Sequence, residues 1–275
     1  KRLGSNVTVI EFLDHIVPGM DKDISTEFQK ILNKQGINFK LNSKVTAASV
    51  VKNKVVVDLT NNKSSKRERI ECDKVLVAVG RKPYTKGLGL EKLNLKMDNK
   101  GAIVVNKNFS TSISGIYAIG DVTTGPMLAH KASAEGHMLA EIISGKTSNI
   151  NYDTIPAVVY TEPEVAWVGA TEDDLKKSKI DYNVGSFPLS ANSRAYTMGG
   201  YSGTVKILAC AKTDRILGGH IIGPHAGELI GEIVVAMEMG VSSEDLALSC
   251  HAHPTLSESI KEAASIAYYG KGVHF

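Results

Sequence analysis

The chain has 275 residues, with 32 lysines and arginines against 29 aspartates and glutamates and a formal net charge of +3. Hydrophobic residues make up 43% of the chain and charged residues 22%, which excludes disordered and fibrous proteins. The charge surplus is too small to indicate a nucleic acid or an anionic membrane as partner, and the chain has no run of 18 apolar residues that would predict a membrane span. The length suggests about two domains.

Three cysteines occur, Cys72, Cys210 and Cys250. Their number is odd and they include no Cys-x-x-Cys pair, so a disulfide framework is not expected. A reducing compartment is the natural interpretation.

The first part of the chain predicts a parallel α/β unit. Val7–Ile10 is a short β-branched run typical of a buried strand, and a helix follows from about Asp21 to Gln35, with Gly36 as its stop. Further strands are predicted at Ile37–Leu41, Val50–Leu59 and Asp73–Val79. The polar stretch Asn61–Arg69 is interpreted as a solvated hairpin tip and not as a binding site.

The rest of the chain predicts a middle segment and an α+β domain. The middle segment holds apolar runs at Ala102–Val105 and Ile116–Ile119 and a helix from about His130 to Ile143. One antiparallel sheet and two closing helices follow, with strands expected at Ala157–Tyr160, Val165–Val168, Tyr182–Phe187, Val205–Ala211 and Ile216–Ile222, and helices at Ala226–Met239 and Ser257–Tyr268.

Two acidic residues follow apolar runs that read as strands. Glu11 comes directly after the first strand, where a dinucleotide-binding unit places a carboxylate on the adenosine ribose hydroxyls. Asp121 follows Gly120, which allows close backbone approach of a ligand, and a helix begins soon afterwards. A plain strand end and a turn without a ligand remain the alternatives. No Gly-x-Gly-x-x-Gly motif occurs in the chain.

The segment from Cys250 to Glu258 has the highest density of side chains that could take part in catalysis or bind a metal. His253 is a candidate general base, and Glu258 is a candidate to hold its second ring nitrogen. Thr255 and Glu258 also have the spacing of a helix capping box with Thr255 at N-cap, and both interpretations hold together only if the carboxylate is shared or Thr255 is not the cap. A zinc site from Cys250, His251 and His253 is a poorer alternative, because these residues are too close in sequence to suit a tetrahedral site.

Six segments together give a resemblance that extends over the whole chain. They are Val9–Glu11, Val77–Pro83, Ala118–Val122, Met127–Ala132, Tyr160–Glu164 and His251–Glu258. In order and spacing they resemble the flavin- and NAD-dependent pyridine nucleotide-disulfide oxidoreductases, and within that family the members that oxidise dihydrolipoamide.

The resemblance implies a fold of mixed α/β and α+β class. We expect a partial Rossmann-like NAD unit over residues 1–82, a returning segment of the FAD domain over 83–151, and a C-terminal dimerisation domain with an antiparallel sheet over 152–275. The implied activity is oxidation of dihydrolipoamide to lipoamide with reduction of NAD, through FAD and a redox disulfide. The implied partners are a second copy of the chain and the lipoyl domains of 2-oxo acid dehydrogenase complexes, in a bacterial cytoplasm or a mitochondrial matrix. No metal is expected.

The resemblance also implies roles for individual residues. His253 matches the catalytic base and Glu258 the carboxylate that orients it. The NAD site is matched by Glu11, Val45 and Gly80, and the FAD site by Asp121, Met127, Leu128, Ala129 and His130.

Departures from the family pattern leave alternatives open. The flavin glycine motif, the Cys-x4-Cys redox pair and the first strand of the NAD unit are not in these 275 residues. We therefore expect the C-terminal portion of such an enzyme, inactive alone. The alternatives are an isolated non-catalytic dimerisation module and an NADPH-dependent glutathione-type reductase, although Glu11 and Asp14 would repel a 2′-phosphate.

Overall fold

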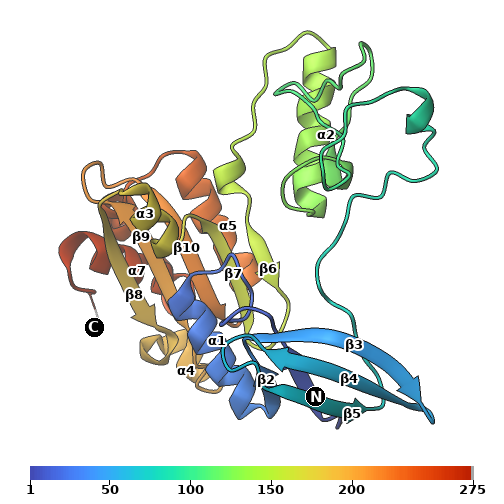
Figure 1. Cartoon of the computed structure of the whole chain (residues 1–275). Helices are drawn as coiled ribbons and strands as arrows, with labels where there is room; N and C mark the ends of the chain where they lie inside the picture. Colours follow the sequence, from blue (N-terminus) through green and yellow to red (C-terminus); the bar gives the residue numbers. More distant parts are fainter. Residues whose placement is uncertain (274–275) are drawn as a thin grey trace. The chain divides into compact units, whose positions relative to one another are not determined.

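A computed structural model describes residues 1–273 and divides the chain into two compact units (Figure 1). The first unit combines Lys1–Val75 with the chain from Asp153 onward, and the second holds Leu76–Tyr152. The predicted mixed α/β and α+β class is confirmed, because one parallel strand pair and two antiparallel sheets occur among the described residues.

The first unit begins with the predicted strand–helix–strand element. Strands β1 (Val7–Ile10) and β2 (Ile37–Lys40) pair in parallel, and helix α1 (Lys22–Lys34) lies between them in the chain. Asp21 caps α1 by accepting a hydrogen bond from the backbone N–H of Asp23. Ile24, Phe28 and Leu32 form the buried face of the helix.

An antiparallel sheet follows, in which β3 (Ser43–Val51) pairs with β4 (Lys54–Asn61) and β4 pairs with β5 (Arg67–Cys72). The prediction of one strand over Val50–Leu59 is wrong, because the chain turns at Lys52 and Asn53. Both residues have positive φ angles, 46° and 65°, as a two-residue hairpin loop requires. The polar stretch after Asn61 forms the next hairpin loop, as predicted.

The strand predicted over Asp73–Val79 is also wrong, since β5 ends at Cys72 and an extended segment without strand pairing follows. Leu76, Val77 and Val79 are 88%, 75% and 91% exposed. A buried strand needs neighbours on both edges, and the described part of the chain places none beside this run.

The second unit is built around helix α2 (Ala129–Ile143), close to the predicted bounds. Two 3-10 helices, η1 (Leu90–Lys92) and η2 (Gly120–Val122), precede it. The apolar runs of the middle segment form isolated bridges, Met97 with Ile103 and Ser110 with Tyr117, and not strands.

The C-terminal part of the first unit is an α+β domain with one five-stranded antiparallel sheet, as predicted. The strand order is β6-β7-β10-β9-β8. The strands are β6 (Ala157–Val159), β7 (Glu164–Gly169), β8 (Tyr182–Pro188), β9 (Thr204–Cys210) and β10 (Ile216–Gly223). The predicted long helices are α5 (Ala226–Glu238) and α7 (Glu258–Tyr269). The shorter elements are η3 (Tyr152–Thr154), α3 (Glu172–Ser178), η4 (Leu189–Ala191), α4 (Ser193–Thr197) and α6 (Ser243–Leu248).

The two faces of this sheet bury different partners. Helix α5 covers β7 and β10, and α7 covers β8 and β9, which gives the main hydrophobic core. Val165 and Ile222 lie opposite one another in the sheet and pack into a second core with Ile24 and Phe28 of α1. The α1 region and the sheet of the α+β domain therefore form one packed body.

Helix α7 lies so close to the sheet that one position of β8 requires glycine. A Cβ atom at Gly185 would come within 1.8 Å of the carbonyl oxygen of Ala263. No rotation of a side chain relieves a contact with backbone, so Gly185 fixes how closely α7 approaches.

Candidate active site

His253 and Glu258 form the pair that the sequence predicts. His253 Nδ1 lies 2.9 Å from Glu258 Oε1. Glu258 is the first residue of α7, and its side chain is 19% exposed, whereas the His253 side chain is 67% exposed. A carboxylate only accepts, so Nδ1 is the donor and Nε2 carries the lone pair of the neutral ring. The pair therefore presents an accessible basic nitrogen with a fixed tautomer.

Glu258 also binds the backbone at the start of α7. Its Oε2 accepts a hydrogen bond from the N–H of Thr255 at 2.8 Å, so the carboxylate is shared between a ring and a backbone donor. Thr255 as N-cap is wrong: Ser257 holds that position, and the Thr255 hydroxyl donates to the Ala252 carbonyl at 2.7 Å. The orienting and the structural roles of Glu258 are thus compatible.

The alternative of a zinc site is not supported. Cys250, His251 and His253 do not form a metal-binding group in the described part of the chain. His251 instead contacts Glu232 Oε1 through Nε2 at 2.7 Å and the Ser249 carbonyl through Nδ1 at 3.1 Å.

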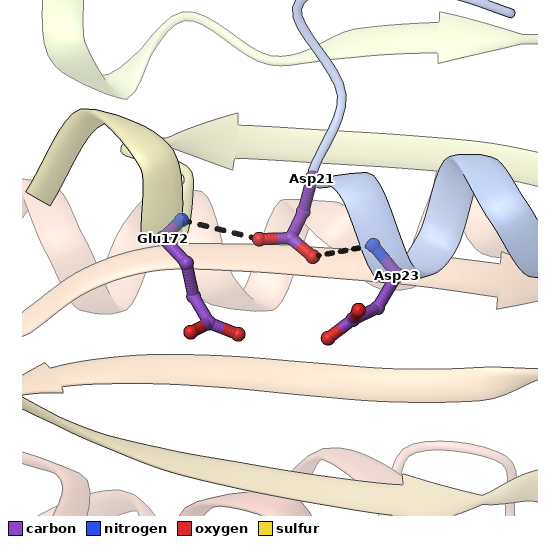
Figure 2. Close-up of side chains that lie close together, drawn as sticks. All are labelled: Asp21, Asp23 and Glu172. Atoms are coloured by element: carbon purple, nitrogen blue, oxygen red, sulfur yellow. Dashed lines mark hydrogen bonds between the residues drawn. The ribbon is translucent and has the colours of Figure 1, made fainter. Parts of the chain in front are cut away.

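In residues 1–273, one cluster of three carboxylates has oxygen atoms close enough together to hold a metal ion. Its members are Asp21, Asp23 and Glu172 (Figure 2). A lysine ammonium already lies among them. Lys206 Nζ is 2.8 Å from Asp21 Oδ1, 2.8 Å from Asp23 Oδ2 and 2.5 Å from Glu172 Oε1. The Lys206 side chain is 3% exposed, so this is an internal ion-pair network and not an open cation site.

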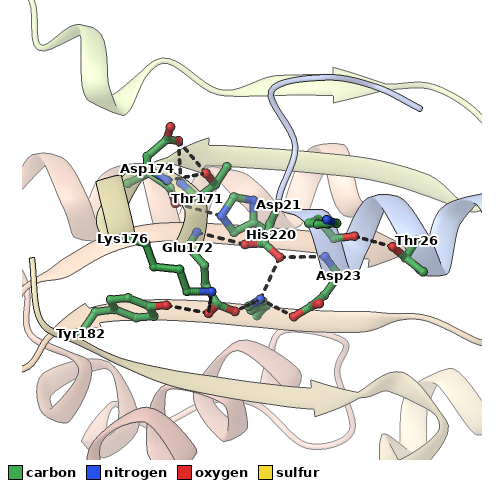
Figure 3. Close-up of polar contacts among 12 residues, drawn as sticks. Asp21, Asp23, Thr26, Thr171, Glu172, Asp174, Lys176, Tyr182 and His220 are labelled. Atoms are coloured by element: carbon green, nitrogen blue, oxygen red, sulfur yellow. Dashed lines mark hydrogen bonds and ion pairs between the residues drawn. The ribbon is translucent and has the colours of Figure 1, made fainter. Parts of the chain in front are cut away.

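Opposing effects set the protonation of this network (Figure 3). Burial acts to raise the pKa of Glu172, but hydrogen bonds from Lys206, Tyr182 and Lys176 outweigh it and lower the pKa from 4.5 to about 2. Burial likewise opposes a net lowering of the pKa of Asp21 by Lys206. Burial acts to lower the pKa of Lys206, yet its carboxylate partners raise it above the ordinary value. Glu172, Asp21 and Lys206 are therefore charged at neutral pH.

The network was not predicted from the sequence. Register explains how it forms: Lys206 on β9 lies directly opposite His220 on β10, which lies opposite Trp167 on β7. These side chains share the sheet face that α1 covers. Burial lowers the pKa of His220, whose Nε2 lies 3.0 Å from the Ala170 carbonyl.

The residues expected at an NAD site lie in both units. Glu11 directly follows β1, and its Oε1 accepts a hydrogen bond from the Leu13 N–H at 2.9 Å. The backbone N–H of Ser43, the first residue of β3, bonds to the Glu11 carbonyl at 2.9 Å. Val45 lies further along β3 and is 47% exposed. Gly80 belongs to the second unit and has a φ of 103°.

The residues expected at an FAD site all lie in the second unit. Asp121 is exposed in η2, and Met127, Leu128, Ala129 and His130 lead into α2. Leu128 at the N-cap of α2 provides no side-chain cap. Backbone N–H groups at such a helix start attract a phosphate or another electron-rich group.

A buried ion pair, which was not predicted from the sequence, holds the turn that carries Asp121. Lys131 and Glu135 are 3.0 Å apart, with side chains 0% and 2% exposed. Glu135 Oε2 accepts from the Gly120 N–H at 2.7 Å, and Lys131 Nζ donates to the Gly120 carbonyl at 3.3 Å. Gly120 has a φ of 71°, and a Cβ there would meet Ala132 Cβ at 3.1 Å. The i,i+4 spacing of the two charges was the available signal.

Glu135 has a second hydrogen-bond partner, Tyr152. The Tyr152 hydroxyl donates to Glu135 Oε1 at 2.9 Å. Burial, together with this carboxylate, raises the pKa of Tyr152 to about 12.

Among the described residues, no helix is long and apolar enough to cross a bilayer.

Two family models match the chain. One is described as pyridine nucleotide-disulphide oxidoreductase and matches residues 1–136. The other is described as the pyridine nucleotide-disulphide oxidoreductase dimerisation domain and matches residues 155–264.

Curated relatives match the chain over its whole length. A dihydrolipoamide dehydrogenase of Chaetomium thermophilum is 54% identical over 275 residues, and the mitochondrial dihydrolipoyl dehydrogenase of Homo sapiens is 51% identical over 277. Each match covers 100% of this chain and 54% of the relative. The chain thus spans about half the length of the curated relatives it matches.

Solved structures of two further proteins are similar to this chain. LpdA from Mycobacterium tuberculosis is 30% identical with a TM-score of 0.86, over 95% of this chain and 56% of that one. The flavoprotein disulfide reductase RclA from Escherichia coli is 29% identical with a TM-score of 0.85, over 96% of this chain and 60% of that one. The chain therefore belongs to the pyridine nucleotide-disulphide oxidoreductases, a family of enzymes, and contains that family's dimerisation domain.

Proposed function

We propose that the protein acts as a dihydrolipoamide dehydrogenase, oxidising dihydrolipoamide to lipoamide with reduction of NAD. The observation that carries this proposal is the His253–Glu258 pair, with Nδ1 held at 2.9 Å and Nε2 as the basic nitrogen. The relatives named dihydrolipoamide or dihydrolipoyl dehydrogenase over the whole chain support it.

His253 would start the reaction as a general base. A thiolate and not a thiol attacks a disulfide, so Nε2 removes the proton of one thiol of dihydrolipoamide. The thiolate attacks the redox disulfide of the enzyme and releases one of its sulfurs as a thiolate. The second thiol of the substrate then passes its proton to that released thiolate and attacks the substrate sulfur of the mixed disulfide, which closes lipoamide and releases the other enzyme sulfur as a thiolate. Glu258 stabilises the imidazolium that forms at His253. The described cysteines are free, and the disulfide is not among these 275 residues.

FAD and NAD are the proposed cofactors. FAD would carry the electron pair from the reduced disulfide to NAD, which takes it as hydride. The turn at Gly120 and Asp121, followed by the uncapped start of α2, suits a polyol hydroxyl and a phosphate. Met127, Leu128, Ala129 and His130 are proposed contacts of the same group.

The proposal favours NAD over NADP at the residues near β1. Glu11 would accept hydrogen bonds from ribose hydroxyls, and a 2′-phosphate there would meet its negative charge and that of Asp14. Val45 and Gly80 are the other proposed residues of this site. Glu11→Gln is expected to raise the ratio of NADP to NAD turnover, because it removes one of these charges.

The proposed partners are a second copy of the chain and lipoyl domains. The match to a dimerisation domain supports the homodimer, for which light scattering should give twice the mass of one chain. The lipoyl partner follows from the proposed substrate. Relatives named as mitochondrial support a mitochondrial matrix over a bacterial cytoplasm.

A substrate panel on the full-length protein tests the proposal. Purified protein is assayed with dihydrolipoamide and NAD, and separately with glutathione disulfide and NADPH. We expect turnover only in the first assay. Turnover with NADPH and glutathione disulfide would replace the proposal by the glutathione-type alternative, and turnover in neither would favour a non-catalytic dimerisation module.

A further inference from the structure

His251, two residues before His253, is held on both sides. Its Nε2 lies 2.7 Å from Glu232 Oε1 on helix α5, and its Nδ1 lies 3.1 Å from the Ser249 carbonyl. The His251 side chain is 9% exposed, in contrast to 67% for His253. The two rings therefore face different environments although only Ala252 separates them.

The two contacts exclude His251 as a second base. A carboxylate oxygen and a carbonyl oxygen can only accept, and each of them lies against one ring nitrogen of His251. No ring nitrogen remains to take a proton from a substrate.

The segment that carries both rings needs such support. Residues 249–257 connect α6 to α7 without forming a helix or strand of their own. The Ser249 carbonyl receives a second donor, Lys261 Nζ from α7, at 3.1 Å. His251 and Lys261 thus tie the start of the loop to the two helices that cover the sheet.

We propose that His251 and Glu232 are positioning residues, which hold the loop so that His253 meets Glu258. The inference rests on the proposed function, in which His253 is the base. Glu232 anchors the ring of His251, the ring anchors the backbone at Ser249, and His253 is presented four residues later. Without the contact between Glu232 and His251, the exposed His253 ring loses its hydrogen bond to Glu258 and bonds to water instead.

The test is the tautomer of His253, measured by nitrogen-15 NMR of histidine-labelled protein at about pH 7.5, where an ordinary histidine is mostly neutral. In the unmodified protein the Nδ1–H form should dominate. Glu232→Ala should lower the ratio of the Nδ1–H to the Nε2–H form about fivefold, as expected for loss of one hydrogen bond of ordinary strength.

Glu232→Gln separates positioning from a general loss of structure. Its amide can still donate to Nε2 of a neutral His251 while Nδ1–H bonds to Ser249, so the His253 ratio should return close to that of the unmodified protein. Asp14→Asn is the matched control, because Asp14 forms a separate pair with His15 at 2.7 Å. It should leave His253 unchanged.

The results that would overturn the inference are an unchanged His253 ratio in Glu232→Ala, or an equal change in the control. The measurement of the His253 tautomer does not require substrate turnover. An inactive protein with the expected shifts would therefore contradict the proposed function and leave the positioning role intact.

Discussion

Replacing Lys206 by methionine tests whether the buried ion network ties α1 to the sheet. The methionine fills a similar volume but removes the cation from Asp21, Asp23 and Glu172, each of which has one carboxylate oxygen within 4.8 Å of the other two. Breaking a buried pair by removing one partner leaves uncompensated charge and costs about 3–5 kcal/mol of unfolding free energy. We expect Lys206→Met to lose that amount at pH 7.

The pH dependence gives a second, sharper signature. In the parent protein the pKa of Glu172 falls from 4.5 to about 2, so its contribution is fully present above about pH 4.5 and is lost as the pH falls toward 2. At about 1.4 kcal/mol per pKa unit, the contribution is at most about 3.5 kcal/mol. In Lys206→Met the neighbouring carboxylates raise one another's pKa, so the variant should gain stability as the pH falls from 7 to 5.

Urea denaturation at pH 7 and pH 5 measures both effects. Asp23→Asn is the control, because the Asp23 side chain is 76% exposed and its pair with Lys206 should contribute less than about 1 kcal/mol. A Lys206→Met variant as stable as the parent, or one with the parent's pH slope, would refute the account of the network.

Three further predictions concern other parts of the chain. Lys131→Met should destabilise the second unit by about 3 kcal/mol or more, because it leaves Glu135 buried without its cation, and the loss should appear as faster hydrogen exchange at Gly120. Gly185→Ala should prevent close packing of α7 and lower the thermal midpoint of unfolding strongly. Gly231→Ala in α5 should leave the midpoint unchanged, because a Cβ there meets nothing within 4 Å. Raising the pH from 7 to 10 should leave the Tyr152 phenol protonated in an ultraviolet titration, since its pKa is about 12.

Local patterns predicted the elements whose signals lie within one segment. The β-branched run at Val7–Ile10 and the apolar face of α1 specify a strand and a helix without reference to the rest of the chain. The turn at Lys52 and Asn53 escaped prediction because neither residue is glycine and β-branched residues lie on both sides of it, although the polar run Lys52–Lys54 interrupts them. The apolar run after Cys72 reads as a strand, but pairing depends on neighbours that a local pattern does not describe.

The same distinction applies to the site. The spacing of His253 and Glu258 at the start of a helix allowed their contact to be predicted, and the structure shows it. Lys206 and Asp21 are 185 positions apart and meet only because α1 packs against the sheet that contains β9. No local pattern of charge or hydrophobicity indicates such a contact.

The most direct test of the central claim is the activity of His253→Gln in the full-length protein. Glutamine keeps a polar side chain of similar size but cannot take the thiol proton, so kcat for dihydrolipoamide oxidation should fall about 10²- to 10⁴-fold. His15→Gln, which removes the ring of the Asp14–His15 pair, should keep the activity of the unmodified protein. Activity of His253→Gln close to that of His15→Gln would contradict the assignment of His253 as the base.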